Sequence, residues 1–338
     1  MKFSTLLSMV LLASLGGCSK PDSEATLTDY QQRLSRVLEL ETVKVQVVPV
    51  AVLPRPSELR QPLPDIRVNL RDAWASRECS LDQLIGERNS GLGRVYQPSK
   101  QLNYELRLLS RLQQCQQQNI SPALQQQISH WQDEKQQSIA IALSNMLLAD
   151  DTLRRQWQSV SQQLVTGEGN GFVPTSSALN NLAELTRLIA QQHWQQAAAL
   201  DIEQSLGAIY QYDFLAKLQN SLRYSAAWFS QLNPQLLAIA PASLCPRGQS
   251  TEQLSILTTV FRKFFIGKVQ AHLAELSRFY NESWPIIAML YQDTAIYPAL
   301  QQRYQQPAEQ LRLQLMQHVT WWQQLNTACP VNLTQSPD

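Results

Sequence analysis

The sequence predicts an all-α protein, built as a single multi-helix domain with an extended, proline-rich segment near the N-terminus. Three observations support this fold class. Apolar residues recur with the 3.6-residue period of amphipathic helices through most of the chain. Only 11 of the 338 residues are glycine, which leaves little room for the tight turns of β-hairpins. Prolines gather within residues 49–64, where the helical period is interrupted.

The first 17 residues are predicted to be a secretory signal peptide. Lys2 gives the chain a positively charged start, and a largely apolar run from Phe3 to Leu15 follows it. This run is shorter than the roughly 20 residues that a permanent bilayer span needs. The stretch Leu-Gly-Gly-Cys that ends at Cys18 resembles the lipobox of bacterial lipoproteins. The alternative is an ordinary cleaved signal that happens to precede a cysteine.

The lipobox resemblance implies a lipid anchor. In that family the cysteine sulfur receives a diacylglycerol, the signal is cut before the cysteine, and the new amine receives an acyl chain such as palmitate. Two or three chains give stable attachment, whereas one chain gives only marginal binding. Ser19, in place of an aspartate, implies sorting to the outer membrane. We therefore expect lipidation of Cys18, a polar tether over residues 18–26, a periplasm-facing position in the cell envelope, and one helical domain over 27–338.

After the tether the pattern is helical with one interruption. Thr26 and Thr28 can cap a first helix that ends near Leu40. The run from Val43 to Leu53 is β-branched and partly alternating, and the prolines after it favour an extended surface segment over a central strand. We expect the later helices over residues 68–77, 80–89, 99–119, 122–149, 151–166, 176–199, 201–232, 250–282, 284–304 and 307–327.

Two of these helices have additional support. Ser121 and Pro122 place a cap residue and a proline at the first turn of the helix over 122–149. Within residues 254–280 the apolar stripe is wide, which predicts a central position in the bundle. After the signal peptide no run of apolar residues is long enough to cross a bilayer, so the sequence predicts no span in the mature chain.

Four cysteines remain besides Cys18, an even number that suggests disulfides in an exported protein. We expect Cys79 to pair with Cys115, because a helical hairpin returns the far end of its second helix to the start of its first. Cys245 and Cys329, each followed by proline at a helix end, form the other expected pair. The alternatives are other pairings or free buried thiols. A zinc site is not expected, because the chain has no Cys-x-x-Cys motif.

The densest polar cluster lies in residues 76–94. Three of the chain's glycines fall there, and glycine permits close approach by another group. A glutamate with a neighbouring arginine and asparagine could do acid–base or sugar-binding work. The alternative is a turn between two helices, held by arginine–carboxylate hydrogen bonds. The candidate interaction residues are Arg77, Glu78, Glu87, Arg88, Asn89 and Arg94. Asp82 lies in the same segment, and Glu105 and Arg107 lie on the following helix.

Three segments of the mature chain, together with the lipobox, carry a resemblance to a known family. They are Ser76–Cys79, Glu87–Arg94 and Tyr104–Arg107. On these segments the chain resembles the domain of unknown function 3080 family, which consists of proteobacterial proteins of similar length, often described as lipoproteins. The resemblance covers nearly the whole mature chain. It implies no activity and no catalytic residues.

Composition and spacing narrow the possible functions. The formal net charge of +1 argues against a nucleic-acid partner, which requires a strong basic excess. Glutamine supplies 45 residues, which form either a plain polar helix surface or a hydrogen-bonding face for a glycan or a partner. The histidines lack metal-site spacing; His272 and Glu275 could form half of a metal site, but we expect a polar pair. We expect no cofactor, because no phosphate-loop or dinucleotide motif occurs.

Three functions remain open from the sequence. The first is a non-enzymatic, lipid-anchored protein that binds an envelope protein or glycan. The second is an enzyme that acts on cell-envelope material such as peptidoglycan through residues 76–94, whose carboxylates should then line an open cleft as a pair roughly 5–9.5 Å apart. The third is a small-ligand carrier. Its groove would be lined by Trp228, Trp284, Trp321 and Trp322, although clustered aromatic residues are more often core.

Overall fold

The computed structural model describes residues 21–64, 76–91, 93, 96–167, 169–329 and 331, with the backbone alone at Ser76 and Glu78. Within these residues the regular structure is helical and no strand occurs, so the all-α prediction is confirmed. The predicted signal peptide, Cys18 and most of the predicted helix 68–77 lie outside the described residues. Among the described helices, none combines the length and the apolar character that crossing a membrane requires.

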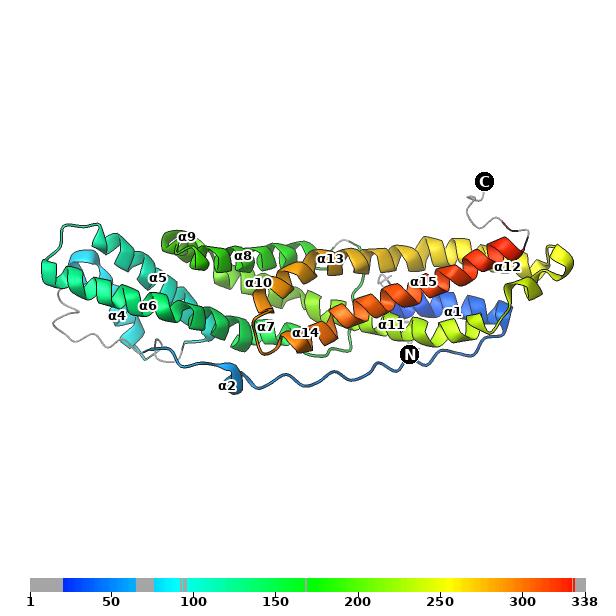
Figure 1. Cartoon of the computed structure of the whole chain (residues 1–338), viewed down its shortest axis with the longest axis horizontal. Helices are drawn as coiled ribbons and strands as arrows, with labels where there is room; N and C mark the ends of the chain where they lie inside the picture. The colour runs from blue at the N-terminus through cyan, green and yellow to red at the C-terminus, as the bar shows by residue number, and fades with distance from the viewer. Residues whose placement is uncertain are drawn as a thin grey trace, which may run out of the picture.

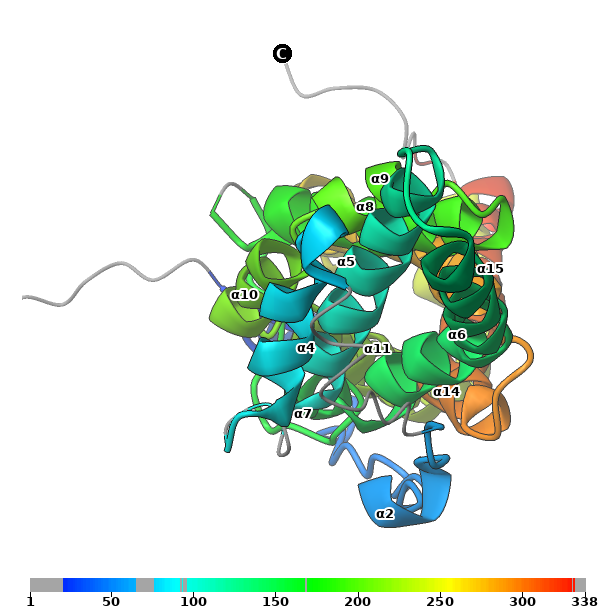
Figure 2. The same ribbon diagram turned by 90° about the vertical axis from the view of Figure 1, so that its left-hand side faces the viewer.

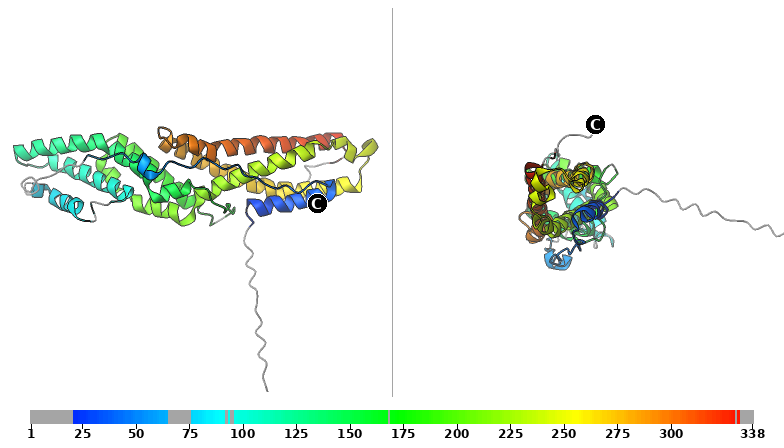
Figure 3. Two further views of the ribbon diagram at one scale, coloured as in Figure 1. Left: turned by 90° about the horizontal axis from the view of Figure 1, so that it is seen from below. Right: turned by 90° about the vertical axis from the view of Figure 1, so that its right-hand side faces the viewer.

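Helical segments follow one another along the described chain. In order they are α1 (Ser23–Leu38), α2 (Pro56–Leu59), a 3₁₀ turn (Ser76–Cys79), α4 (Leu81–Asn89), α5 (Pro98–Gln116), α6 (Pro122–Ala149), α7 (Asp151–Gln156), α8 (Phe172–Ala190), α9 (Trp194–Ala199), α10 (Ile202–Tyr212), α11 (Phe214–Leu237), two 3₁₀ turns (Pro241–Leu244 and Pro246–Gly248), α12 (Glu252–Val260), a π-helix (Phe261–Gln270), α13 (Ala271–Tyr291), α14 (Tyr297–Arg303) and α15 (Gln305–Ala328). They form an elongated bundle with α4, α5 and α6 at one end and α1, α12 and α15 toward the other (Figure 1, Figure 3).

The predicted extended segment is present as a strap, residues 39–64, which runs along the outside of the bundle from the end of α1 toward the end that holds α4 (Figure 1). Three arginine side chains of the bundle donate hydrogen bonds to its backbone carbonyls. The pairs are Arg223 with Val48, Arg303 with Ala51, and Arg154 with Pro54. These carbonyls lie three residues apart, which is the period of a polyproline II helix. The strap is therefore an extended segment fastened by side chains rather than by a strand ladder.

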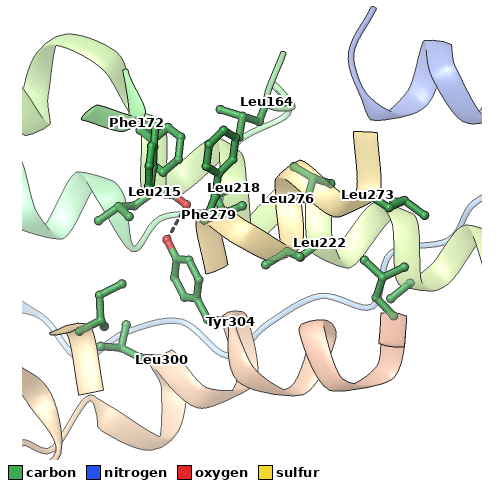
Figure 4. Close-up of a cluster of buried hydrophobic side chains, with 14 of the residues drawn as sticks. Leu164, Phe172, Leu215, Leu218, Leu222, Leu273, Leu276, Phe279, Leu300 and Tyr304 are labelled. Atoms are coloured by element: carbon green, nitrogen blue, oxygen red, sulfur yellow. Dashed lines mark hydrogen bonds between the residues drawn. The ribbon is translucent and has the colours of Figure 1, made fainter. Parts of the chain in front are cut away.

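Most buried side chains belong to one large core that runs through the bundle. Figure 4 shows part of it, where Phe172 of α8, Leu215 of α11 and Phe279 of α13 meet the start of α15. The rings of Phe172 and Phe279 lie 4.5 Å apart between centroids. Buried Tyr304 donates its hydroxyl hydrogen bond to the carbonyl of Leu215, so its polar atom has a partner inside the core.

A second, smaller core fills the end of the bundle formed by α4, α5 and α6. Helix α5 contributes to both cores. Its residues Leu102, Leu106 and Leu109 belong to the large core. Tyr104 and Leu108 belong to the small one. The two sets lie on different faces because residues three or four apart share one face of a helix.

Both predicted disulfides are present. Cys79, in the 3₁₀ turn before α4, pairs with Cys115 in the last turn of α5, with Cα atoms 5.4 Å apart. Cys245, between the 3₁₀ turns after α11, pairs with Cys329 at the end of α15, with Cα atoms 5.7 Å apart. The Cys79–Cys115 disulfide lies at the end of the elongated bundle that holds α4, and the Cys245–Cys329 disulfide lies at the opposite end, beside α12 (Figure 1).

Helix α1 begins earlier than predicted. Asp22 caps it, because its Oδ1 accepts the backbone N–H of Ala25 at 2.9 Å. Residues 23–26, assigned to the tether by the sequence, are therefore helical. Thr26 is a buried residue inside the helix, so the prediction that Thr26 or Thr28 forms the cap is wrong. Aspartate is at least as good a cap as threonine, and Asp22 precedes both threonines in the chain.

Helix breaks that depend on distant side chains were not visible in the sequence pattern. The predicted helix 151–166 ends at Gln156, because Gln219 and Asn220 of α11 donate to carbonyls of the loop that follows. The predicted helix 201–232 is divided at Asp213, which adopts a left-handed conformation with φ 48° and accepts from Arg155 at 2.5 Å. Both breaks satisfy backbone or charged groups across the fold.

Two further boundaries differ from the prediction. The predicted helix 176–199 begins at Phe172 and breaks after Ala190, where Gln192 has φ 57°. The predicted gap near residue 283 is absent, since α13 continues to Tyr291 with Pro285 inside it. Between α12 and α13 the chain continues as a π-helix over Phe261–Gln270. This type of helix is rare and occurs frequently at functional sites.

Candidate functional site

A cavity of about 50 Å³ lies at the end of the bundle formed by α4, α5 and α6, the end that faces the viewer in Figure 2. We call it the end pocket. Its wall combines apolar side chains with charged and amide groups. The apolar residues are Leu63, Pro64, Leu81, Ile85, Leu108 and Trp131, and the polar ones are Arg88, Asn89, Gln101, Tyr104, Glu105 and Lys135. Two residues of the predicted interaction loop, Arg88 and Asn89, are thus brought to the same wall as Glu105.

A buried ion pair forms part of this wall. Lys135 Nζ of α6 lies 2.8 Å from Glu105 Oε2 of α5, and the two side chains are only 6% and 3% exposed. Gln101, one turn earlier on α5, donates a hydrogen bond to Glu105 Oε1. Desolvating two charges cancels much of their attraction, so such a pair adds little stability compared with apolar residues of the same size. Its presence in the cavity wall is therefore weak evidence that it stabilises the fold.

Lys135 was missed by the sequence analysis, although a signal was present. It lies on the apolar stripe of α6 that contains Ile128, Trp131 and Ile139. It is also the one lysine or arginine in this helix. A lone lysine on a buried helix face needs a partner, because an unpaired buried charge is costly. The partner, Glu105, could not be assigned without the α5–α6 packing.

The remaining residues of the predicted loop are distributed around the pocket rather than gathered in it. Arg77 lies with its Nε 3.7 Å from Asp82 Oδ2, and its side chain is exposed. Glu87 does not line the end pocket and instead accepts a hydrogen bond from Arg107 of α5. The side chain of Glu78 and the whole of Arg94 lie outside the described residues.

Glu87 forms the hydrogen bonds that hold the loop against α5. Its carboxylate accepts from Tyr96 Oη at 2.8 Å and from Arg107 Nη1 and Nη2 at 3.2 and 3.0 Å. Partial burial would raise the pKa of Glu87, but the hydrogen bonds from Tyr96 and Arg107 outweigh it and lower the pKa below its ordinary value. The predicted turn held by arginine–carboxylate bonds is therefore present here.

Gly93 shows the close approach that the glycines of this loop predicted. A Cβ at this position would collide with the backbone carbonyls of Glu87 and Arg88. The N–H of Gly93 donates to Ser90 Oγ at 3.0 Å, and its carbonyl accepts from Arg88 Nη1. Glycine is thus required by space at this one turn.

The described carboxylates of the loop region do not form the free pair that catalysis would use. Asp82 lies beside Arg77, Glu87 is bound by Arg107, and Glu105 is bound by Lys135. Each acid is therefore neutralised by its own cation. Within the described residues, no group of three or more metal-ligating side chains occurs either.

The other candidate residues from the sequence are buried in the core or form local ring contacts and hydrogen bonds. Trp228, Trp321 and Trp322 are each 1% exposed and belong to the large core, so they do not line a groove. Trp284 is half-buried and stacks on neighbouring tyrosines. His272 contacts Ser23 Oγ and Thr166 Oγ1 at 2.8 and 3.3 Å, while Glu275 accepts the backbone N–H of Gly167 at 3.0 Å. His272 and Glu275 thus bind different partners, and no third metal-ligating side chain joins them among the described residues.

A second buried histidine, His318, lies in the large core. Its Nε2 accepts the indole N–H of Trp322 at 3.1 Å, which leaves the proton on Nδ1 to donate to Asn233 Oδ1 at 3.1 Å. Burial lowers the pKa of His318 to about 3. Burial also lowers the pKa of His272 to about 4, against the opposite effect of Glu275 and Asp22. Both rings are therefore held neutral in the folded chain.

We expect the free energy of unfolding to fall as the pH drops below about 6.5, the ordinary histidine pKa. The folded pKa of each ring lies below the unfolded one, so the unfolded state binds more protons in this range. From pH 7.5 to 5 the loss should be about 2 kcal/mol for each of His272 and His318. Urea unfolding at several pH values measures it. His318→Gln should remove about half of the slope, and Gln324→Leu, which changes no titratable group, should leave it unchanged. Equal slopes in both variants would contradict this assignment.

These features define a disulfide-linked, all-α bundle with a partly polar pocket at one end. The sequence matches the family described as "Protein of unknown function (DUF3080)" over residues 27–333. Because the match spans most of the chain, the protein belongs to this family, and the resemblance carried by its motifs is confirmed. Comparisons with curated proteins and with solved structures found no match.

Proposed function

We propose that the protein is a lipid-anchored envelope protein, facing the periplasm from the outer membrane, that binds a partner through the end pocket. The observation that carries the binding role is the Glu105–Lys135 pair in the pocket wall. Polar groups buried at a cost in desolvation are most useful where they recognise something. The anchor rests on the N-terminal signal pattern and on Cys18.

The chemistry of the wall favours one kind of contact. Leu81, Ile85 and Trp131 offer an apolar surface, while Gln101 and Lys135 offer donors beside it. The cavity of about 50 Å³ suits a single small group of a larger partner rather than a whole ligand. We therefore favour a partner that inserts one apolar group with a hydrogen-bonding end. Enzymatic action on envelope material is less well supported, because each described carboxylate of the region has a cation beside it.

Replacing Cys18 with alanine tests the anchor. We expect the Cys18→Ala protein to be folded and to leave the membrane fraction, because only the acyl chains would hold it there. Fractionation of cells and mass measurement of the N-terminal peptide give the result. The matched control is Ser19→Asp, which should keep the lipid and move the protein to the inner membrane. A Cys18→Ala protein that still fractionates with membranes would show that the anchor is not Cys18.

Site-specific crosslinking tests the pocket. A photo-reactive amino acid at Asn89, an exposed residue of the wall, should give a discrete adduct in intact cells. The same group at Leu313, which is 55% exposed on α15, is the matched control and should give none. Identical adducts at both positions, or no adduct at Asn89, would mean that the end pocket is not the binding site.

A further inference from the structure

A second cavity, of about 220 Å³, lies between the strap and helices α11, α14 and α15. We call it the strap pocket. It shares no lining residue with the end pocket. The strap contributes Gln46 and the run 47–50, and the bundle contributes polar side chains that face them. Its volume is below that of sites that enclose drug-sized ligands, and it suits one small molecule.

The charge of this pocket is positive and unopposed. Arg223 of α11 lines it and donates to the carbonyl of Val48, while its other N–H groups have no acceptor among the described residues. No carboxylate is among the described residues that line the pocket. Burial lowers the pKa of Arg223, and no acidic group acts against this effect. The N–H groups of Arg223 that do not bind Val48 can form charge-assisted hydrogen bonds with an anion.

A second arginine strengthens this charge. Arg303 of α14 is 3% exposed, and its three donor nitrogens bind backbone carbonyls rather than a carboxylate. Burial lowers the pKa of Arg303, and the nearby charge of Arg223 lowers it further. Arg223 and Arg303 bind strap carbonyls only three residues apart, at Val48 and Ala51, so two like charges lie under the same part of the strap. An oxyanion would relieve their repulsion.

The pocket also contains a set of unengaged amides. Gln302, Gln306 and Gln310 follow one another at successive turns of α14 and α15, and Gln46 lies on the strap side. None of these four side chains has a hydrogen bond to the described part of the chain. Each amide can both donate and accept, which is what recognition of hydroxyl groups requires. Ser230 adds a hydroxyl, whose own hydrogen is donated to the carbonyl of Ala227 at 2.7 Å.

We propose that the strap pocket binds an oxyanion carried on a small hydroxylated molecule, the chemistry of sugar phosphates and sugar acids. Arg223 holds the anionic group by charge-assisted hydrogen bonds. The glutamine amides bind the hydroxyl groups, and Val47 and Pro307 contact the apolar edges of the ligand. This site is independent of the end pocket and of the lipid anchor, so it stands whether or not the function proposed above is correct.

Calorimetric titration of the whole mature chain with four probes tests the proposal. Glucose 6-phosphate or glucuronate should bind, while glucose and inorganic phosphate should each bind at least tenfold more weakly, since each lacks half of the recognised groups. The variant Gln306→Leu/Gln310→Leu should weaken binding of the anionic sugar by about tenfold, because each lost hydrogen bond is worth roughly a factor of three to ten. Arg223→Gln should weaken it at least as much.

Gln324→Leu, at an exposed position of α15 outside the pocket, is the matched control and should leave the affinity unchanged. The glutamine double variant does not touch the fastening of the strap, so it remains informative if Arg223→Gln loosens the fold. Three results would each overturn the proposal. They are no binding of either anionic sugar, equal affinity for inorganic phosphate, and binding that survives Gln306→Leu/Gln310→Leu.

Discussion

Replacing Lys135 with methionine should lower the free energy of unfolding by about 3–5 kcal/mol, the largest effect we expect from one side chain of the end pocket. Methionine keeps most of the volume and removes the charge. Glu105, only 3% exposed, then remains as a buried acid without its cation. Denaturant unfolding of the wild type and the variant at pH 7 measures the loss.

The double variant Glu105→Met/Lys135→Met separates the cost of an unpaired charge from the worth of the pair. Removing both charges leaves no buried ion, and apolar replacements of buried pairs are often neutral or stabilising. We therefore expect the free energy of unfolding of the double variant to lie within about 1 kcal/mol of the wild-type value or above it. A double variant as unstable as Lys135→Met would mean that the pair itself stabilises the fold.

Removing either disulfide should have an effect of similar size. The pair Cys245–Cys329 closes 84 residues and Cys79–Cys115 closes 36. The chain-entropy relation gives losses of about 4.5 and about 4 kcal/mol for the two alanine double variants. Either loss is a large part of the 5–15 kcal/mol by which domains are usually stable. Guanidinium unfolding under non-reducing conditions measures both midpoints.

Cys18→Ala is the matched control for the disulfide variants, because it removes a cysteine that belongs to neither pair. Its unfolding midpoint should equal that of the wild type. The Cys79→Ala/Cys115→Ala protein should also become sensitive to protease first in α4 and α5, because this disulfide ties the turn before α4 to the last turn of α5. Unchanged midpoints in both double variants would show that the disulfides do not stabilise the fold by reducing the conformational entropy of the unfolded chain.

Local patterns predicted the parts of this fold that depend on neighbours in sequence. The apolar period predicts α6 from Pro122 to Ala149, and Ser121 accepts the backbone N–H of Leu124 as its cap. The proline run predicts the strap. The expected helical hairpin predicts the Cys79–Cys115 disulfide, and the helix-end positions of Cys245 and Cys329 predict the other pair; both are present.

Features that depend on distant side chains could not be read from the sequence. The left-handed Asp213 is paired with Arg155, 58 residues away. The strap is fastened by Arg223 and Arg303, whose partners are carbonyls rather than side chains with a recognisable type. Lys135 and Glu105 are ordinary helix residues until α5 and α6 pack together. The sequence therefore pointed to part of the end-pocket wall, through Arg88, Asn89 and Glu105, and not to its buried cation.

The most direct test of the proposed binding role is the crosslink at Asn89 measured in the Glu105→Met/Lys135→Met background. We expect this protein to be folded, anchored and as stable as the wild type, yet to lose the adduct, because recognition depends on the buried pair while stability does not. The Asn89 adduct in the otherwise wild-type chain is the reference. A double variant that is folded and still gives the full adduct would contradict the claim that the Glu105–Lys135 pair serves binding.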